Sequence, residues 1–165
     1  MVSPVTRHSP LATRRHAAAF TLIELLVVMA IIAVLAGLGF GAVQGAFASS
    51  KRAQARNDVN QLAAAVKSYA LEFGRLPEEG NEIAALTGDN PKGITFFEAK
   101  QASGNPPRNG LSANRTELLD PWGTPYVVYL DEDYDNRVDY AGEEFMTTVV
   151  VESEGDAKGK ISNVK

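Results

Sequence analysis

Residues 20–43 read FTLIELLVVMAIIAVLAGLGFGAV, and Glu24 is the only charged residue in this run. As a helix rising about 1.5 Å per residue, the run extends about 36 Å, whereas the apolar core of a bilayer is roughly 30 Å thick. It is also longer than the apolar region of an ordinary signal peptide. The run therefore predicts a transmembrane helix over residues 20–43.

Basic residues and then small residues precede this helix. Residues 14–16 read RRH, and residues 17–19 read AAA. In an ordinary secretory signal the small residues at the cleavage point follow the apolar run, whereas here they come before it. Cleavage after Ala19 would remove residues 1–19 as a leader and leave the helix at the N-terminus of the mature protein. The alternative is an anchor helix that is never cut.

Glu24 lies inside the apolar run, where an acid costs about 2.5–3.5 kcal/mol on insertion scales. Two interpretations account for it. In one, Thr21 and Glu24 form a capping box that satisfies free amides at the helix start and places negative charge on the positive end of the helix dipole. In the other, Glu24 pairs with the new amino group of Phe20, on its own chain or on a neighbour packed alongside. Such a pair would set the axial register between subunits.

A helical pattern continues after the apolar run. Apolar residues recur at spacings of three and four, and Gly74 and Pro77 are typical of a helix end. We therefore expect one long helix over residues 20–73, with a transmembrane first half and an amphipathic second half that packs on a soluble domain of residues 44–165. The predicted apolar stripe comprises Val59, Leu62, Ala63, Val66, Tyr69, Ala70 and Phe73.

The rest of the chain predicts a small antiparallel sheet packed against this helix, so the predicted fold class is α+β. Trp122 is expected in the core. Residues 78–119 are rich in turn-forming residues and read mostly as loop. The expected elements are a short helix at 82–86, a turn at 120–123, and strands at 125–130 and 145–151.

The composition argues against an enzyme. The chain contains no cysteine, and both histidines, His8 and His16, lie in the predicted leader. The mature protein would then lack the groups that form Ser-His and Cys-His nucleophiles and His- or Cys-ligated zinc sites. Loss of the leader also removes three arginines and lowers the formal charge from −4 to −7, which argues against nucleic-acid binding.

Residues 131–139 form an acidic segment that reads DEDYDNRVD. Acids at alternate positions, a residue that tolerates a left-handed turn and a final Val-Asp match the first nine positions of a calcium loop. Strands rather than helices are expected on either side, so the segment is not an EF-hand. The alternative is a solvated hairpin tip without a bound ion. The candidate Ca²⁺ ligands are Asp131, Asp133, Asp135, Asn136 and Asp139.

The motif FTLIELL, preceded by basic and small residues, resembles the signal motif of type IV pilins and type II secretion pseudopilins. Three later stretches resemble these proteins too: SKRAQARNDVNQLAAAVKSYALEFGRLP at 50–77, DPWGTPY at 120–126 and SEGDAKG at 153–159. Together they are most similar to the major pseudopilins of the type II secretion system, over residues 14 to 159. The likeness weakens between residues 78 and 117.

This resemblance implies a pilin-like fold and a structural role in a filament. It implies that a prepilin peptidase cuts between Ala19 and Phe20, that the Phe20 amine is methylated, and that Glu24 neutralises the N-terminal amine of a neighbour. The subunit would cross the bacterial inner membrane once, with a periplasmic C-terminal domain. It would then polymerise with copies of itself into a pseudopilus that drives protein export, with minor pseudopilins and an inner-membrane assembly platform as further partners.

The resemblance also implies calcium binding in the C-terminal loops, which supports the acidic segment as a ligand set. That segment lies earlier in the chain than the family's calcium loop, so Glu154 and Asp156 are further candidates. Two departures are that Ala19 replaces the usual Gly before the cut and that Gly41 replaces a common Pro. The alternatives are a subunit of a surface type IV pilus and a singly anchored exported protein that uses calcium to bind a ligand.

Overall fold

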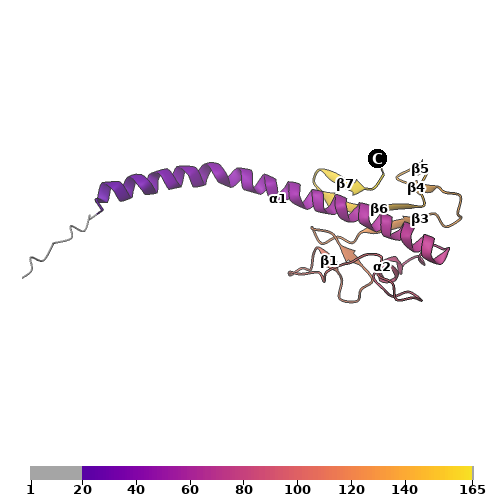
Figure 1. Ribbon diagram of the computed structural model, residues 1–165. Helices are drawn as coiled ribbons and strands as arrows, with labels where there is room; N and C mark the ends of the chain where they lie inside the picture. Colours follow the sequence, from indigo (N-terminus) through magenta and orange to yellow (C-terminus); the bar gives the residue numbers. More distant parts are fainter. Residues whose placement is uncertain (1–19, 165) are drawn as a thin grey trace, which may run out of the picture. The chain divides into compact units, whose positions relative to one another are not determined.

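The computed structural model describes residues 20–164, except for the side chains of residues 38–42. The chain divides into two compact units, Met1–Val43 and Gln44–Lys165. The predicted α+β class is confirmed (Figure 1). The elements are α1 (Leu22–Phe73), α2 (Glu82–Leu86), β1 (Gly110–Leu111), β2 (Leu118–Leu119), β3 (Val127–Leu130), β4 (Val138–Tyr140), β5 (Glu143–Phe145), β6 (Val149–Asp156) and β7 (Gly159–Ser162).

Helix α1 ends where the sequence predicts. Gly74 adopts a φ of 67°, in the left-handed region that glycine enters easily, and its N–H donates to the Ala70 carbonyl at 2.9 Å. Pro77 follows shortly afterwards and disfavours a further helical turn. The helix therefore stops for local reasons that are visible in the sequence.

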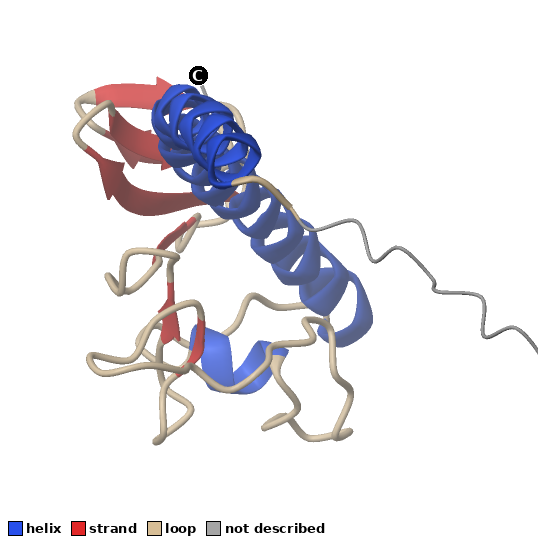
Figure 2. Ribbon diagram, turned by 90° about the vertical axis from the view of Figure 1, so that its left-hand side faces the viewer, coloured by secondary structure: helices blue, strands red, loops and turns tan. Residues whose placement is uncertain are grey.

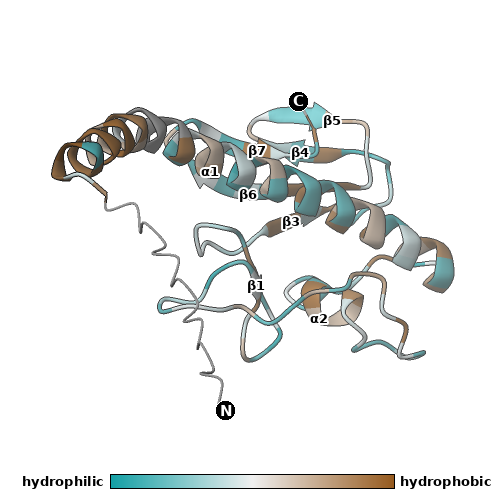
Figure 3. Cartoon of the chain, turned by 60° about the vertical axis from the view of Figure 1, so that its left-hand side comes forward, coloured by the Kyte–Doolittle hydropathy of each residue, from teal (hydrophilic) through white to brown (hydrophobic). Residues whose placement is uncertain are grey.

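The beginning of α1 is strongly apolar, and Figure 3 shows it in brown. Its large apolar side chains are exposed, including those of Leu22, Ile23 and Leu35. Within the part of the chain that is described, no helix meets both the length and the hydropathy needed to cross a bilayer.

The largest sheet has three antiparallel strands in the order β3-β6-β7. Val127 of β3 lies opposite Glu152 of β6, and Leu130 lies opposite Val149. Strands β4 and β5 form a separate antiparallel pair, as do β1 and β2. Figure 2 shows the strands of these small sheets and the helices in different colours.

The core of the second unit lies between the later part of α1, the central strand β6 and α2. The predicted stripe on α1 is confirmed, because Val59, Leu62, Val66 and Tyr69 are buried, with Ala70 and Phe73 at the margin. Burying a Val or Leu side chain stabilises a fold by about 1.5–3 kcal/mol. The same core cluster includes Leu86, Val149, Val151 and Ile161.

Two predictions about the strands need correction. The expected strand at 145–151 is wrong, because residues 146–148 bend between β5 and β6, and the Thr147 hydroxyl bonds the backbone of Val149. The acidic segment is also not a simple hairpin tip. It leads from β3 into the β4–β5 pair before the chain returns as β6. Trp122 is only partly buried, at the edge of the core.

Candidate functional site

Phe20 is the first described residue, and its side chain is 79% exposed. Ala19, the other residue of the predicted cleavage site, lies outside the described residues, together with the rest of the predicted leader. The cleavage prediction therefore stays a prediction.

Glu24 and Thr21 form a reciprocal capping box at the start of α1. The Thr21 N–H donates to Glu24 Oε2 at 2.9 Å, the Thr21 hydroxyl donates to the same oxygen at 2.8 Å, and the Glu24 N–H donates to Thr21 Oγ1 at 3.3 Å. No described residue donates a hydrogen bond to Glu24 Oε1. The cap therefore occupies only one carboxylate oxygen and leaves the other available, so capping and pairing with an amine are compatible.

The acidic segment is organised around Asp131, which directly follows β3 and is only 2% exposed. Its Oδ1 accepts the N–H of Asp135 at 3.1 Å, and its Oδ2 accepts the N–H of Asn136 at 2.8 Å. A buried carboxylate is stable when such donors satisfy it. Asp131 therefore folds the following residues into a tight turn.

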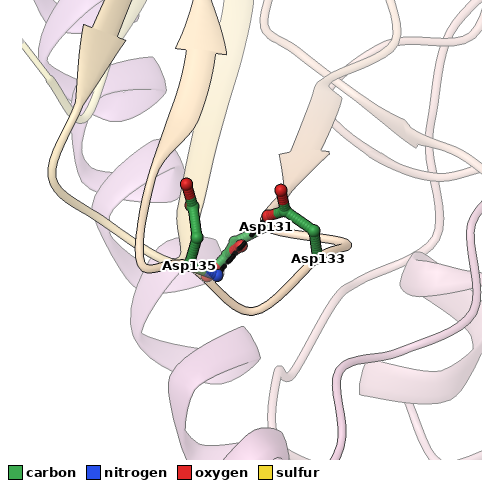
Figure 4. A group of neighbouring side chains, drawn as sticks. All are labelled: Asp131, Asp133 and Asp135. Atoms are coloured by element: carbon green, nitrogen blue, oxygen red, sulfur yellow. Dashed lines mark hydrogen bonds between the residues drawn. The ribbon is translucent and has the colours of Figure 1, made fainter.

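This turn brings three predicted ligands together. Tyr134 and Asn136 adopt φ values of 61° and 64°, in the left-handed region, and the chain curls back on itself. One carboxylate oxygen from each of Asp131, Asp133 and Asp135 lies within 4.8 Å of the others. Figure 4 shows the three side chains on one turn. Because Ca²⁺ binds oxygens at about 2.3–2.6 Å, this spacing fits one ion that contacts all three residues.

Asp139 does not belong to this group of converging carboxylates among the residues described. It lies in β4 opposite Glu144, so its backbone follows the ladder rather than the turn. Asp139 lines the same cleft as Asp133 and Asp135, a hollow of about 450 Å³. Asn136 donates its backbone N–H to Asp131 Oδ2 and in this way takes part in the turn.

Sequence reasoning missed two acids of this cleft. Glu79 and Glu82 lie about 50 residues earlier, around the start of α2, and line the hollow together with the acidic segment. No local signal connects them to residues 131–139, because only the tertiary fold brings the two segments together.

Glu154 and Asp156, the further candidates for calcium, both contact basic groups. Asp156 forms an ion pair with Arg52 of α1. Glu154 Oε2 lies 3.7 Å from Lys160 Nζ. The N–H of Lys158, which donates to Asp156, and the guanidinium of Arg52 hold the pKa of Asp156 below its usual value. In this structure both residues serve contacts within the fold.

A buried glutamate joins three strands. Glu152 of β6 accepts a hydrogen bond from the Tyr140 hydroxyl of β4 and one from Lys160 Nζ of β7, the latter at 2.6 Å. Burial and the contact with Glu152 raise the pKa of Tyr140 to about 12. The hydrogen bond and charge of Glu152 raise the pKa of Lys160. These contacts fasten the β4–β5 pair to the main sheet.

Comparison with known proteins covers both units of the chain. Residues 14–40 match the prokaryotic N-terminal methylation motif, and residues 42–141 match the model of type II secretion system protein G. The type II secretion system core protein G of Pseudomonas aeruginosa is 33% identical over 116 residues, which cover 68% of this chain and 73% of that protein. The protein of the same name from Aeromonas hydrophila is 28% identical, over 70% of this chain and 74% of its own length.

A third relative with the same name, from Pectobacterium carotovorum, is 31% identical over 66% of this chain and 64% of its own length. No solved structure matches the chain significantly.

Proposed function

We propose a function for this chain from one premise: it belongs to the type II secretion system protein G family. The chain is a structural subunit of the type II secretion pseudopilus and polymerises through its N-terminal helix to drive protein export. The observation that carries this conclusion is the order of the two matches, the methylation motif at 14–40 followed directly by the protein G model at 42–141.

The route to the filament begins with cleavage by a prepilin peptidase between Ala19 and Phe20 and methylation of the new amine. Residues 20–43 then anchor the subunit in the inner membrane in a single pass, and residues 44–165 form a periplasmic domain. The exposed apolar side chains of Phe20, Leu22 and Ile23 support this, because so much apolar surface requires a bilayer or neighbouring copies to cover it.

Glu24 guides assembly in this proposal. Its Oε2 holds Thr21, while Oε1 is available for the Phe20 amine of a neighbouring subunit. An acid and an amine left unpaired in an apolar setting are each destabilising by several kcal/mol, so the pair forms only in the correct axial register. Minor pseudopilins and the inner-membrane assembly platform are the further partners. The chain is not an enzyme in this account, because no Cys or His follows residue 19.

The acidic segment is the proposed calcium site of the periplasmic domain. Asp131, Asp133 and Asp135 would hold the ion, and backbone carbonyls and water would complete the six to eight oxygens that Ca²⁺ takes. The ion would offset the mutual repulsion of these carboxylates and stabilise the turn. Asp139 and Asn136 remain secondary candidates at the same cleft.

A deletion in the native bacterium tests the pseudopilus role. Loss of the gene should trap exported proteins in the periplasm, and a plasmid copy should restore their release. A matched copy with Phe20→Asp should not restore their release, because the charged side chain at the first residue of the mature protein opposes burial among neighbouring helices. Normal export in the deletion strain, with surface adhesion lost instead, would favour a surface pilus and contradict the proposal.

Thermal unfolding of the full chain in detergent tests the calcium site. Ca²⁺ at about 100 times its Kd should stabilise the protein by about 2.7 kcal/mol relative to chelator. The double variant Asp133→Asn/Asp135→Asn should lose this gain. Glu143→Gln, which removes an exposed acid from the neighbouring β5, should keep it. Superimposable melts of the parent protein with Ca²⁺ and with chelator would eliminate the site.

A further inference from the structure

Tyr134 lies in the acidic segment between Asp133 and Asp135, yet its hydroxyl contacts a different part of the domain. The oxygen accepts the backbone N–H of Leu76 at 3.3 Å. Leu76 lies just beyond the end of α1, and its side chain is buried in the core. The contact therefore joins two segments that are 58 residues apart in the chain.

The surroundings of Tyr134 hold its side chain over the segment that leaves α1. Two hollows of the surface are lined by Tyr134 together with Arg75 and Leu76. One of them also includes Glu132, and the other also includes Asp131. The aromatic side chain thus lies between the carboxylate turn and the residues that follow the helix, although it is 60% exposed to solvent.

The backbone at Tyr134 also depends on the turn. Its φ of 61° is uncommon for a residue with a large side chain and persists only where the surrounding contacts hold it. Those contacts come from Asp131, whose carboxylate accepts the N–H of Asp135 immediately after Tyr134. If the carboxylate turn becomes more or less ordered, the position of the Tyr134 hydroxyl therefore changes as well.

We propose that Tyr134 couples the acidic turn to the end of α1, so that a cation held by Asp131, Asp133 and Asp135 also orders residues 74–77. This inference rests on the proposed calcium site. Ca²⁺ fixes the two acids that flank Tyr134 and so fixes the hydroxyl that binds Leu76. Because linkage is reciprocal, the Leu76 contact strengthens Ca²⁺ binding by the same factor by which Ca²⁺ strengthens the contact. Tyr134 acts as a positioning residue and not as a ligand.

Hydrogen exchange of the full chain in detergent, measured with Ca²⁺ and with chelator, tests the coupling. In the parent protein, Ca²⁺ should slow exchange both in residues 131–137 and at the Leu76 amide. Tyr134→Phe keeps the ring and removes only the acceptor, so Leu76 should exchange about 2- to 12-fold faster, the range of one hydrogen bond. In this variant Ca²⁺ should still slow exchange in the turn but should no longer affect Leu76, and titration calorimetry should give a higher Kd.

Tyr140→Phe is the matched control, because it removes the hydroxyl of a tyrosine in the neighbouring β4, where that hydroxyl donates to Glu152 of β6. It should leave Leu76 exchange and the Ca²⁺ Kd unchanged. If Ca²⁺ protects the turn in the parent protein but leaves Leu76 unaffected, or if Tyr134→Phe binds Ca²⁺ as tightly as the parent, the coupling is refuted while the ion site stands. If Ca²⁺ protects neither segment, the site itself is refuted and the coupling with it.

Discussion

Glu24 caps α1 through Thr21 and, in the proposed filament, pairs with an amine, and two substitutions separate the cap from the proposed pairing. Capping needs an acceptor for Thr21, whereas pairing with an amine needs a negative charge. Loss of a helix cap costs about 1 kcal/mol, whereas an unpaired charge in an apolar setting costs several. The charge is therefore expected to dominate assembly.

Glu24→Gln should abolish filament formation, because it keeps an acceptor for Thr21 but cannot neutralise an amine. Thr21→Val should weaken the cap and leave filament yield within about two-fold of the parent, in line with the small energy of a cap. Sedimentation of sheared filaments, with total subunit measured by immunoblot, provides the comparison. Equal filament yield from Glu24→Gln and the parent would refute the pairing role.

Asp120 is the residue on which the turn before β3 depends. It is fully buried, and its Oδ1 accepts the N–H groups of Trp122, Gly123 and Thr124 at 2.8–2.9 Å. Its Oδ2 accepts the Ser153 hydroxyl of β6 at 2.8 Å. This carboxylate therefore links the turn to the central strand of the main sheet.

Asp120→Ala should destabilise the domain by about 3 kcal/mol or more, because it leaves several buried donors without an acceptor. Asp89→Ala removes an exposed acid from a loop and should change stability by less than about 0.5 kcal/mol. Urea denaturation of the two variants beside the parent measures the difference. A similar midpoint for Asp120→Ala and the parent would mean that water replaces the carboxylate.

At the scale of single residues, the sequence predicts the arrangement of the candidate ligands only where local spacing decides their geometry. Alternating acids in a turn predict the convergence of Asp131, Asp133 and Asp135. The same spacing fails for Asp139, because pairing with β5 holds it in a strand. Tyr134 could not be identified from the sequence, since its contact with Leu76 exists only in the folded domain.

At the scale of elements, the contact of Glu152 with β4 and β7 makes stability depend on pH. The folded-state pKa of Tyr140, about 12, and that of Lys160 both lie above their unfolded values of about 10 and 10.4. A raised folded pKa means that the folded state keeps its proton longer than the unfolded state. The stabilisation is therefore complete below about pH 10 and is lost as the pH rises through 10 to 12.

The melting temperature should fall more steeply with pH above 10 in the parent protein than in Glu152→Gln. The variant lacks the charge that adds to the effect of burial on the pKa of Tyr140 and to the effect of the hydrogen bond on the pKa of Lys160. Glu143→Gln, an exposed change on β5, should retain the slope of the parent. Differential scanning calorimetry from pH 8 to 11.5 measures the three slopes. If the melting temperatures of the parent and of Glu152→Gln fall equally steeply with pH, this account is contradicted.

The elements that the sequence predicts well are those with local causes. α1 ends at Phe73 because Gly74 and Pro77 follow it, and α2 lies at the predicted residues. The predicted strand at 145–151 ends too early, because β6 continues through Glu152 and Ser153, polar residues that tertiary contacts bury. β1, β2 and β7 are short, and their partners rather than their own patterns define them.

At the scale of the whole molecule, the two units need different surroundings. The first exposes large apolar side chains, whereas the second buries its own core. A chain that begins at Gln44 should therefore be soluble without detergent, monomeric and cooperatively folded. A chain that begins at Phe20 should require detergent or assembly into a filament. Sedimentation velocity and circular dichroism test this expectation. Aggregation or loss of structure in the shorter chain would show that the domain depends on the helix before it.

The account rests most heavily on an apolar helix that stays with the subunit after a basic leader is removed. Intact-mass spectrometry of the protein, purified from the membranes of the bacterium that makes it, measures this directly. The predicted species begins at Phe20 and is heavier by one methyl group on its N-terminal amine. A subunit that still begins at Met1, or one cleaved after the apolar run so that residues 20–43 are missing, would contradict it.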